Sequence, residues 1–194
     1  MAGHFEALPG GGAAVALDEV EISILRSLAV QLLELIGPGE EAADDDDPLA
    51  ALFTDGPSSP PSDPALARLF PDAYGGPGAA DDERTRAAAA EFRRFTENDL
   101  RARKRDDALA MVRGLDALGS GGAVLELGPD ASRQWLGALN DLRLAIGARL
   151  EVSDDDEEAS ELYTLPDSDP RKPMVMAYLW LGGMQESLIE TLMS

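Results

Sequence analysis

The sequence predicts a mainly α protein: a single-domain helical bundle, spanning residues 1–194, with a small antiparallel β-sheet. Three observations support this fold class. The chain is 44% hydrophobic but only 5% aromatic, and an apolar content dominated by Ala, Leu, Val and Ile favours closely packed helices. Apolar residues recur at helical spacing in several long segments. Short segments bounded by turn residues near the N-terminus and at 123–127 suit strands.

The N-terminal segment predicts a β-hairpin. Pro9 is followed by three glycines, a strong turn signal, and this turn lies between segments 4–8 and Ala13–Leu17. Ala123–Leu127 lies between glycines and predicts a third strand. We expect this strand to join the hairpin in a small sheet at one side of the bundle.

The first helices begin at recognisable capping residues. Asp18 and Glu21 have the form of a capping box, and the apolar pattern that follows them ends at Gly37. Asp63 precedes Pro64 at the start of a short helical stretch. The longest helical segment is 83–118, in which Phe92, Phe95, Leu109, Val112 and Leu115 are expected to supply apolar contacts.

The chain is organised around the helix predicted over 135–150. Its apolar residues fall four, three, four and four positions apart, on one helical stripe: Trp135, Leu139, Leu142, Ile146 and Leu150. Further apolar residues lie off the stripe, so this helix is predicted to be buried at the centre. The last helix is predicted from about 173 to 192.

Three segments are predicted to be mobile loops because they are acidic or rich in Pro and Gly: 38–64, 71–82 and 153–168. The aspartates from Asp44 to Asp47 offer carboxylates to a cation. They lack the glycine-containing spacing of an EF-hand, so a solvated loop is the favoured interpretation.

Charge and composition exclude several functional classes. A net charge of −21 opposes binding to DNA and to anionic membranes. The chain has no cysteine and only one histidine, His4, which excludes thiolate catalysis and disfavours a catalytic triad or a histidine metal site. We therefore expect no cofactor, metal or catalytic residue. No apolar run approaches a membrane span of ~20 residues, no secretion signal precedes the first helix, and a cytoplasmic location is expected.

One stretch departs from the acidic background. Between positions 93 and 105 only Glu97 and Asp99 are acidic, against six basic residues: Arg93, Arg94, Arg101, Arg103, Lys104 and Arg105. This face could contact nucleic-acid phosphates or an acidic partner. The alternative, favoured by the surrounding negative charge, is a solvated helix face.

Two further features are candidates for function. Arg143 and Asn140 interrupt the apolar surface of the central helix, while Gln185 and Glu186 lie on the last helix, where Glu186 could pair with Arg143. We interpret these four residues as a structural polar core between the two helices. The alternative interpretation is a site for a small ligand. Trp180 lies outside the apolar stripe of its helix, so it is a candidate interface residue. A homodimer is therefore possible.

Three segments, EFRRFTENDLRARK, WLGALNDLRLAIGARL and YLWLGGMQESLIETL, resemble in this order an actinobacterial family of unknown function that includes the AosR-type oxidative-stress regulators. The hairpin and LDEVEISILRSLAVQL also fit. The resemblance implies a cytoplasmic, non-enzymatic regulator associated with transcription, a sigma factor and sulfur-carrier-dependent cysteine synthesis. It also implies a redox response through paired cysteines near the N-terminus, which this chain lacks, so thiol sensing does not carry over.

The sequence therefore predicts a regulatory protein that acts through protein contacts, with a sigma factor or another transcription component as the expected partner. Two alternatives remain open. One is direct DNA binding through the basic stretch 93–105. The other is binding of a small ligand in the region of Arg143 and Glu186.

Overall fold

The structure is a computed structural model that describes residues 3–37, 56–75, 82–119, 121–152 and 162–193. It confirms the predicted mainly α fold with a small antiparallel sheet. The strands are β1 (Glu6–Ala7), β2 (Ala13–Leu17) and β3 (Ala123–Leu127). The helices are α1 (Glu19–Ile36), α2 (Pro64–Leu69), α3 (Glu83–Asp116), α4 (Pro129–Arg149) and α6 (Lys172–Met193).

The sheet has the order β1-β2-β3, with both pairs antiparallel. β1 is shorter than the predicted strand 4–8. The turn before β2 ends at Gly12, which has a φ of 95° and lies so close to β3 that a Cβ there would be 2.2 Å from the Leu127 carbonyl oxygen. A glycine is therefore needed where the hairpin meets β3.

Capping residues begin the helices where the sequence predicted. The Asp18 side chain accepts a hydrogen bond from the Glu21 amide, and the Glu21 side chain accepts one from the Asp18 amide, which completes the capping box of α1. Asp63 accepts from the amides of Ala65 and Leu66 at the start of α2. α3 is one continuous helix of 34 residues.

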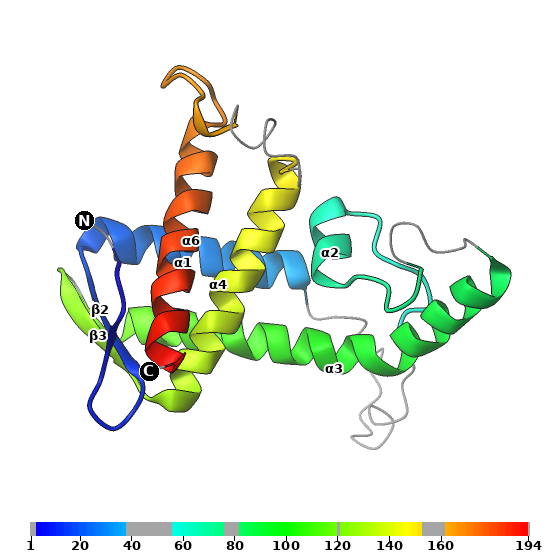
Figure 1. Ribbon diagram of the computed structural model, residues 1–194, viewed down its shortest axis with the longest axis horizontal. Coiled ribbons are helices and arrows are strands. Elements are labelled where there is room, and N and C mark those ends of the chain that lie inside the picture. Colours follow the sequence, from blue (N-terminus) through cyan, green and yellow to red (C-terminus); the bar gives the residue numbers. More distant parts are fainter. Residues whose placement is uncertain (1–2, 38–55, 76–81, 120, 153–161, 194) are drawn as a thin grey trace.

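α4 lies at the centre of the molecule, as predicted, and packs against α1, α2, α3 and α6. Trp135, Leu139 and Leu142 are buried on its predicted stripe. Figure 1 shows α4 and α6 side by side, crossing α1 and α3. The sheet lies at one end of the molecule, and α2 lies with the N-terminal part of α3 at the other.

Large parts of the predicted loops lie outside the described residues, namely 38–55, 76–81 and 153–161, and this includes the acidic run from Asp44 to Asp47. The described parts at 56–63, 71–75 and 164–168 contain no helix or strand. Among the helices that the structure describes, none is long and apolar enough to cross a membrane.

Candidate functional site

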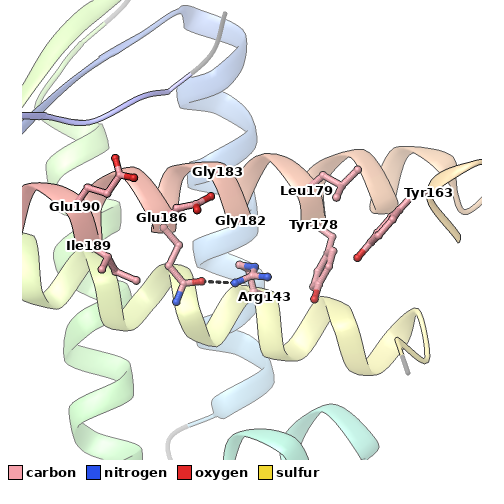
Figure 2. A pocket seen from close by; sticks show the side chains of 10 residues that line it. Arg143, Tyr163, Tyr178, Leu179, Gly182, Gly183, Glu186, Ile189 and Glu190 are labelled. Carbon is pink, nitrogen blue, oxygen red and sulfur yellow. Dashed lines mark hydrogen bonds between the residues drawn. The ribbon is translucent and has the colours of Figure 1, made fainter. Parts of the chain in front are cut away.

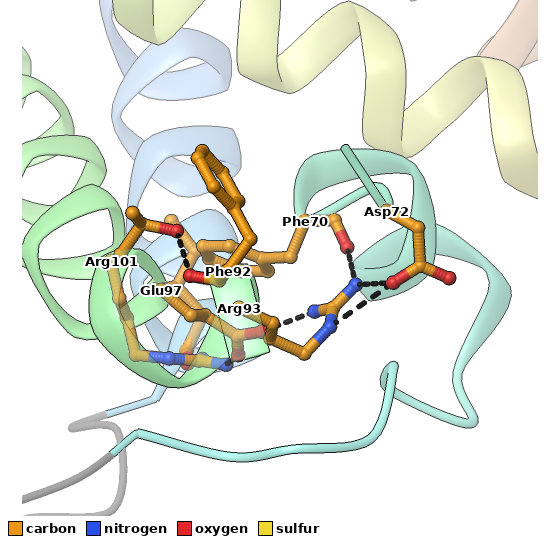
Figure 3. A network of polar contacts seen from close by, with 8 residues as sticks. Phe70, Asp72, Phe92, Arg93, Glu97 and Arg101 are labelled. Carbon is orange, nitrogen blue, oxygen red and sulfur yellow. Dashed lines mark hydrogen bonds and ion pairs between the residues drawn. The ribbon is translucent and has the colours of Figure 1, made fainter. Parts of the chain in front are cut away.

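Four of the six basic residues in the 93–105 stretch of α3 are buried or partly buried and contact other elements of the fold. Arg93 is only 4% exposed. Its Nη2 atom donates to the Phe70 carbonyl oxygen at 2.8 Å and to Asp72 Oδ1 at 2.9 Å, and its Nη1 atom donates to Glu97 (Figure 3). Arg93 thus ties α3 to the end of α2 and the segment that follows it.

Glu97 is buried and lies between two arginines of the same helix. Besides Arg93, it accepts a hydrogen bond from Arg101 Nη2 at 2.7 Å (Figure 3). Arg101 also donates to the Ile36 carbonyl oxygen, and its guanidinium carbon lies 4.3 Å from the centre of the Phe70 ring. Arg105 donates to the Gly37 carbonyl oxygen at 2.6 Å. These two arginines therefore satisfy carbonyl groups at the C-terminus of α1.

Lys104 makes the corresponding contact with α4. Its Nζ atom lies 2.5 Å from Oδ1 of Asp141, which is buried. Burial raises the pKa of Asp141, an effect that the hydrogen bond and the charge of Lys104 oppose. Burial, followed by the charge of Asp141, also raises the pKa of Asp107 on the facing side of α3. Two carboxylates with raised pKa values thus lie between α3 and α4.

The prediction of a basic contact face over 93–105 needs correction. Of its six basic residues, Arg94 and Arg103 are exposed, whereas the other four make the internal contacts described above. A signal for this arrangement was present in the sequence: Arg93, Glu97 and Arg101 are spaced four apart, so they share one helix face and can pair. The sequence alone favours surface charge here, because the segments that contact these arginines, around Phe70 and Ile36, are distant in the chain.

Two phenylalanines of α3, from which the sequence predicts apolar contacts, are largely exposed. Phe92 and Phe95 are 45% and 61% exposed, and Tyr74, whose ring contacts that of Phe92, is 51% exposed. The rings of Tyr74 and Phe92 meet edge to face with centroids 5.9 Å apart, and the Arg94 guanidinium lies 4.8 Å from the Phe95 ring. We call Tyr74, Phe92 and Phe95 the aromatic patch.

The polar group between α4 and α6 forms with a different acceptor from the one predicted. Arg143 Nη1 donates to Gln185 Oε1 at 2.6 Å, and Gln185 Nε2 donates to Asn140 Oδ1 at 3.3 Å. The expected ion pair of Arg143 with Glu186 is not formed, and Glu186 is exposed. The reason is geometric: successive residues of a helix point about 100° apart, so Gln185 and Glu186 cannot both face α4.

A hollow of about 600 Å³ opens beside Arg143 on the outer side of α6 (Figure 2). The side of the Arg143 guanidinium lies against Gly182, and its carbon is 5.1 Å from the centre of the Tyr178 ring. Gly147 on α4 leaves room for that ring, because a Cβ there would be 3.3 Å from it. The remaining walls come from Tyr163 and from α6 residues: Leu179, Gly183, Gln185, Glu186, Ile189 and Glu190.

Trp180 is partly buried, contrary to the prediction of an exposed interface residue. It packs against the core, and a Cβ at Gly3 would lie 3.1 Å from its Nε1 atom. This nitrogen is buried without an acceptor among the described residues. The N-terminal segment around Gly3 packs against Trp180 on the side of α6 that lies off its apolar stripe. Trp180 therefore has a packing role in the structure.

Comparison with known proteins assigns the chain to a family. Residues 2–192 match the family described as a domain of unknown function, DUF2017. This chain belongs to the DUF2017 family. It is 31% identical over 180 residues to the protein named oxidative stress regulator AosR in Mycobacterium tuberculosis and in Mycobacterium bovis, covering 89% of this chain and 78% of each relative. No solved structure is significantly similar.

Proposed function

We propose that this DUF2017 member is a cytoplasmic, non-enzymatic regulator of transcription during oxidative stress, and that it acts by binding a protein partner through the aromatic patch. Relatives that carry the name oxidative stress regulator support the regulatory role. Because the chain contains no cysteine, the proposal assigns the detection of the oxidant to the partner or to an upstream protein.

The observation that carries the proposal is the exposure of three neighbouring aromatic rings. Tyr74, Phe92 and Phe95 are each about half exposed or more, although aromatic residues make up only 5% of the chain. Aromatic side chains and Arg are enriched in the energetically important parts of protein interfaces. A cluster of exposed rings with Arg94 over one of them has the composition of such a contact site.

Charge defines the kind of partner that fits. With a net charge of −21, the protein repels acidic surfaces and attracts basic ones. We therefore expect a partner surface with an apolar centre and a basic rim, on a sigma factor or another component of the transcription machinery. Nucleic acid fits less well, because four of the six cations at 93–105 are engaged inside the protein.

The test is co-purification of the tagged protein from its own cells after exposure to peroxide. Wild type should retain an RNA polymerase subunit or a sigma factor. The double variant Phe92→Ala/Phe95→Ala should lose it, since removal of an interface anchor typically costs about 2 kcal/mol, roughly a 30-fold change in Kd. The matched control is Val20→Ala/Val124→Ala, which removes apolar side chains that are 65% and 61% exposed elsewhere.

Two results would overturn the proposal. In the first, no transcription component is recovered with wild type. In the second, a component is recovered equally well with the double phenylalanine variant, which would place the contact elsewhere. Circular dichroism of both double variants checks that the exposed substitutions leave the helical fold intact.

A further inference from the structure

Among the described residues, the guanidinium of Arg143 has no carboxylate partner, unlike Arg93, Arg101 and Lys104. Arg93, Arg101 and Lys104 each contact a carboxylate at their partly or fully buried positions. In the described part of the chain, Arg143 instead donates to a neutral amide, that of Gln185, and its Nε atom is buried with no acceptor. Within the described ranges, a partly buried positive charge is therefore balanced by no carboxylate in contact with it.

The hollow beside Arg143 is suited to a small organic molecule. One end is formed by the rings of Tyr163 and Tyr178, and apolar side chains of Leu179 and Ile189 line the wall (Figure 2). Gly183 leaves the hollow open. Close packing does not require a glycine here, because a Cβ at this position would meet nothing within 4 Å. Apolar walls around a few polar groups are the usual composition of ligand sites.

The rim carries the opposite charge. Glu186 is exposed, lines the hollow, and lies one helical turn beyond Gly182, against which the Arg143 guanidinium rests. One turn rises about 5.4 Å, so Glu186 lies along α6 from the point where the guanidinium rests, and both groups line the same hollow. A simple anion would be attracted by Arg143 but repelled by Glu186.

We propose that this hollow binds a zwitterionic small molecule of the amino-acid class. Its carboxylate contacts the Nη groups of Arg143, its ammonium contacts Glu186, and its apolar side chain packs against Tyr163 and Tyr178. The site is distinct from the aromatic patch, so the two proposals can fail separately.

The experiment measures binding of three probes by isothermal titration calorimetry. L-phenylalanine carries both charges, 3-phenylpropionate lacks the ammonium, and phenethylamine lacks the carboxylate. We expect phenylalanine to bind about tenfold more tightly than either half-probe, with a Kd of roughly 1 mM or below. The proposal is overturned if phenylalanine shows no binding up to about 10 mM, or binds no better than 3-phenylpropionate.

Variants locate the site. Arg143→Gln should weaken phenylalanine binding by about tenfold or more, and Glu186→Gln should reduce it to the level of 3-phenylpropionate. The matched control, Arg113→Gln, removes an exposed cation from α3 and should have no effect. Gly183→Leu fills the hollow without disturbing packed atoms, so it tests the site even if Arg143→Gln is poorly folded. Unchanged binding in Gly183→Leu or in folded Arg143→Gln would also overturn the proposal.

Discussion

At the scale of single residues, Glu97 joins two arginines of α3 in one buried network. It is 3% exposed and accepts hydrogen bonds from both Arg93 and Arg101, which in turn reach the carbonyl groups of Phe70 and Ile36. Loss of the Glu97 charge would leave two partly desolvated guanidinium groups facing each other. Removing one partner of a buried ion pair is therefore more costly here than at a surface pair.

We predict that Glu97→Gln, which keeps the side-chain shape, lowers the free energy of unfolding by about 3–5 kcal/mol. The control Asp99→Asn makes the same chemical change at an exposed position two residues away and should alter stability by no more than about 0.5 kcal/mol. Urea denaturation followed by circular dichroism measures both values. Equal, small effects of the two substitutions would show that the network contributes little.

Asp141 provides a second prediction at this scale, because burial raises its pKa in the folded state. The groups that face it are Lys104, Asn140, Arg103 and Asp107. The folded protein holds the Asp141 proton more tightly than the unfolded chain does. The stability that this group contributes is therefore fully present below the ordinary pKa of aspartate, and it is lost as the pH rises through the raised folded pKa.

The measurement is the difference in unfolding free energy between wild type and Asp141→Asn across about pH 3 to 7. We expect the advantage of wild type to shrink as the pH rises. Carboxylates with lowered pKa values, such as Asp63 and Asp169, give the opposite trend but are present in both proteins, so they cancel in the difference. Parallel curves for wild type and Asp141→Asn would refute the prediction.

At the scale of elements, the hairpin turn depends on a close approach between backbones. Gly10 and Gly12 have φ values of 96° and 95°, so a side chain at either position is strained. They differ in their surroundings: a Cβ at Gly10 meets nothing within 4 Å, whereas one at Gly12 would lie 2.2 Å from the Leu127 carbonyl oxygen. Only Gly12 is therefore constrained by the neighbouring strand as well as by its conformation.

We predict that Gly10→Ala costs about 1–2 kcal/mol from backbone strain, and that Gly12→Ala costs at least about 2 kcal/mol more because β2 and β3 must separate. Thermal unfolding of the two variants measures the difference. Hydrogen exchange of the β3 amides should increase in Gly12→Ala alone. Similar stabilities for the two variants would mean that the sheet moves to accommodate the methyl group.

The elements themselves were largely predictable from the sequence, and α4 shows why. Its apolar stripe reports burial directly, since a helix that is apolar over most of its surface has to be enclosed. The faces of α3 were not predictable in this way. Phe92 and Phe95 look like core residues and Arg93 looks like a surface residue, but the segment around Phe70 and Asp72 covers the arginine side. That contact joins residues more than twenty positions apart and leaves no local pattern.

The site around Arg143 illustrates the same limit. The sequence grouped Asn140, Arg143, Gln185 and Glu186, and hydrogen bonds join the first three of them in the structure. It pointed to Glu186 as the partner of Arg143, whereas Gln185 is the acceptor, since this depends on the rotation of α6 about its axis. The hollow beside them depends on the absence of side chains at Gly182 and Gly183, which no pattern of polar residues reveals.

At the scale of the whole molecule, the distribution of charge decides which partners can approach. The chain carries a net charge of −21. Most of the basic residues at 93–105 contact other parts of the fold and so do not reduce the negative charge of the surface. Arg93, Arg101 and Lys104 pair with buried carboxylates. The exterior is therefore more uniformly negative than the sequence of α3 suggests, and Arg94 and Arg103 are the exposed cations of the 93–105 stretch.

We therefore predict that the isolated protein does not bind duplex DNA, even at low salt, where electrostatic attraction is strongest. Fluorescence anisotropy with a labelled duplex at about 20 mM salt tests this, because binding that depends on phosphate contacts weakens steeply as salt increases. If binding is found, Arg94→Ala/Arg103→Ala separates its causes. Loss of binding in that variant would show that two exposed arginines suffice to overcome the negative surface, and our assignment of the partner as a protein would have to be replaced.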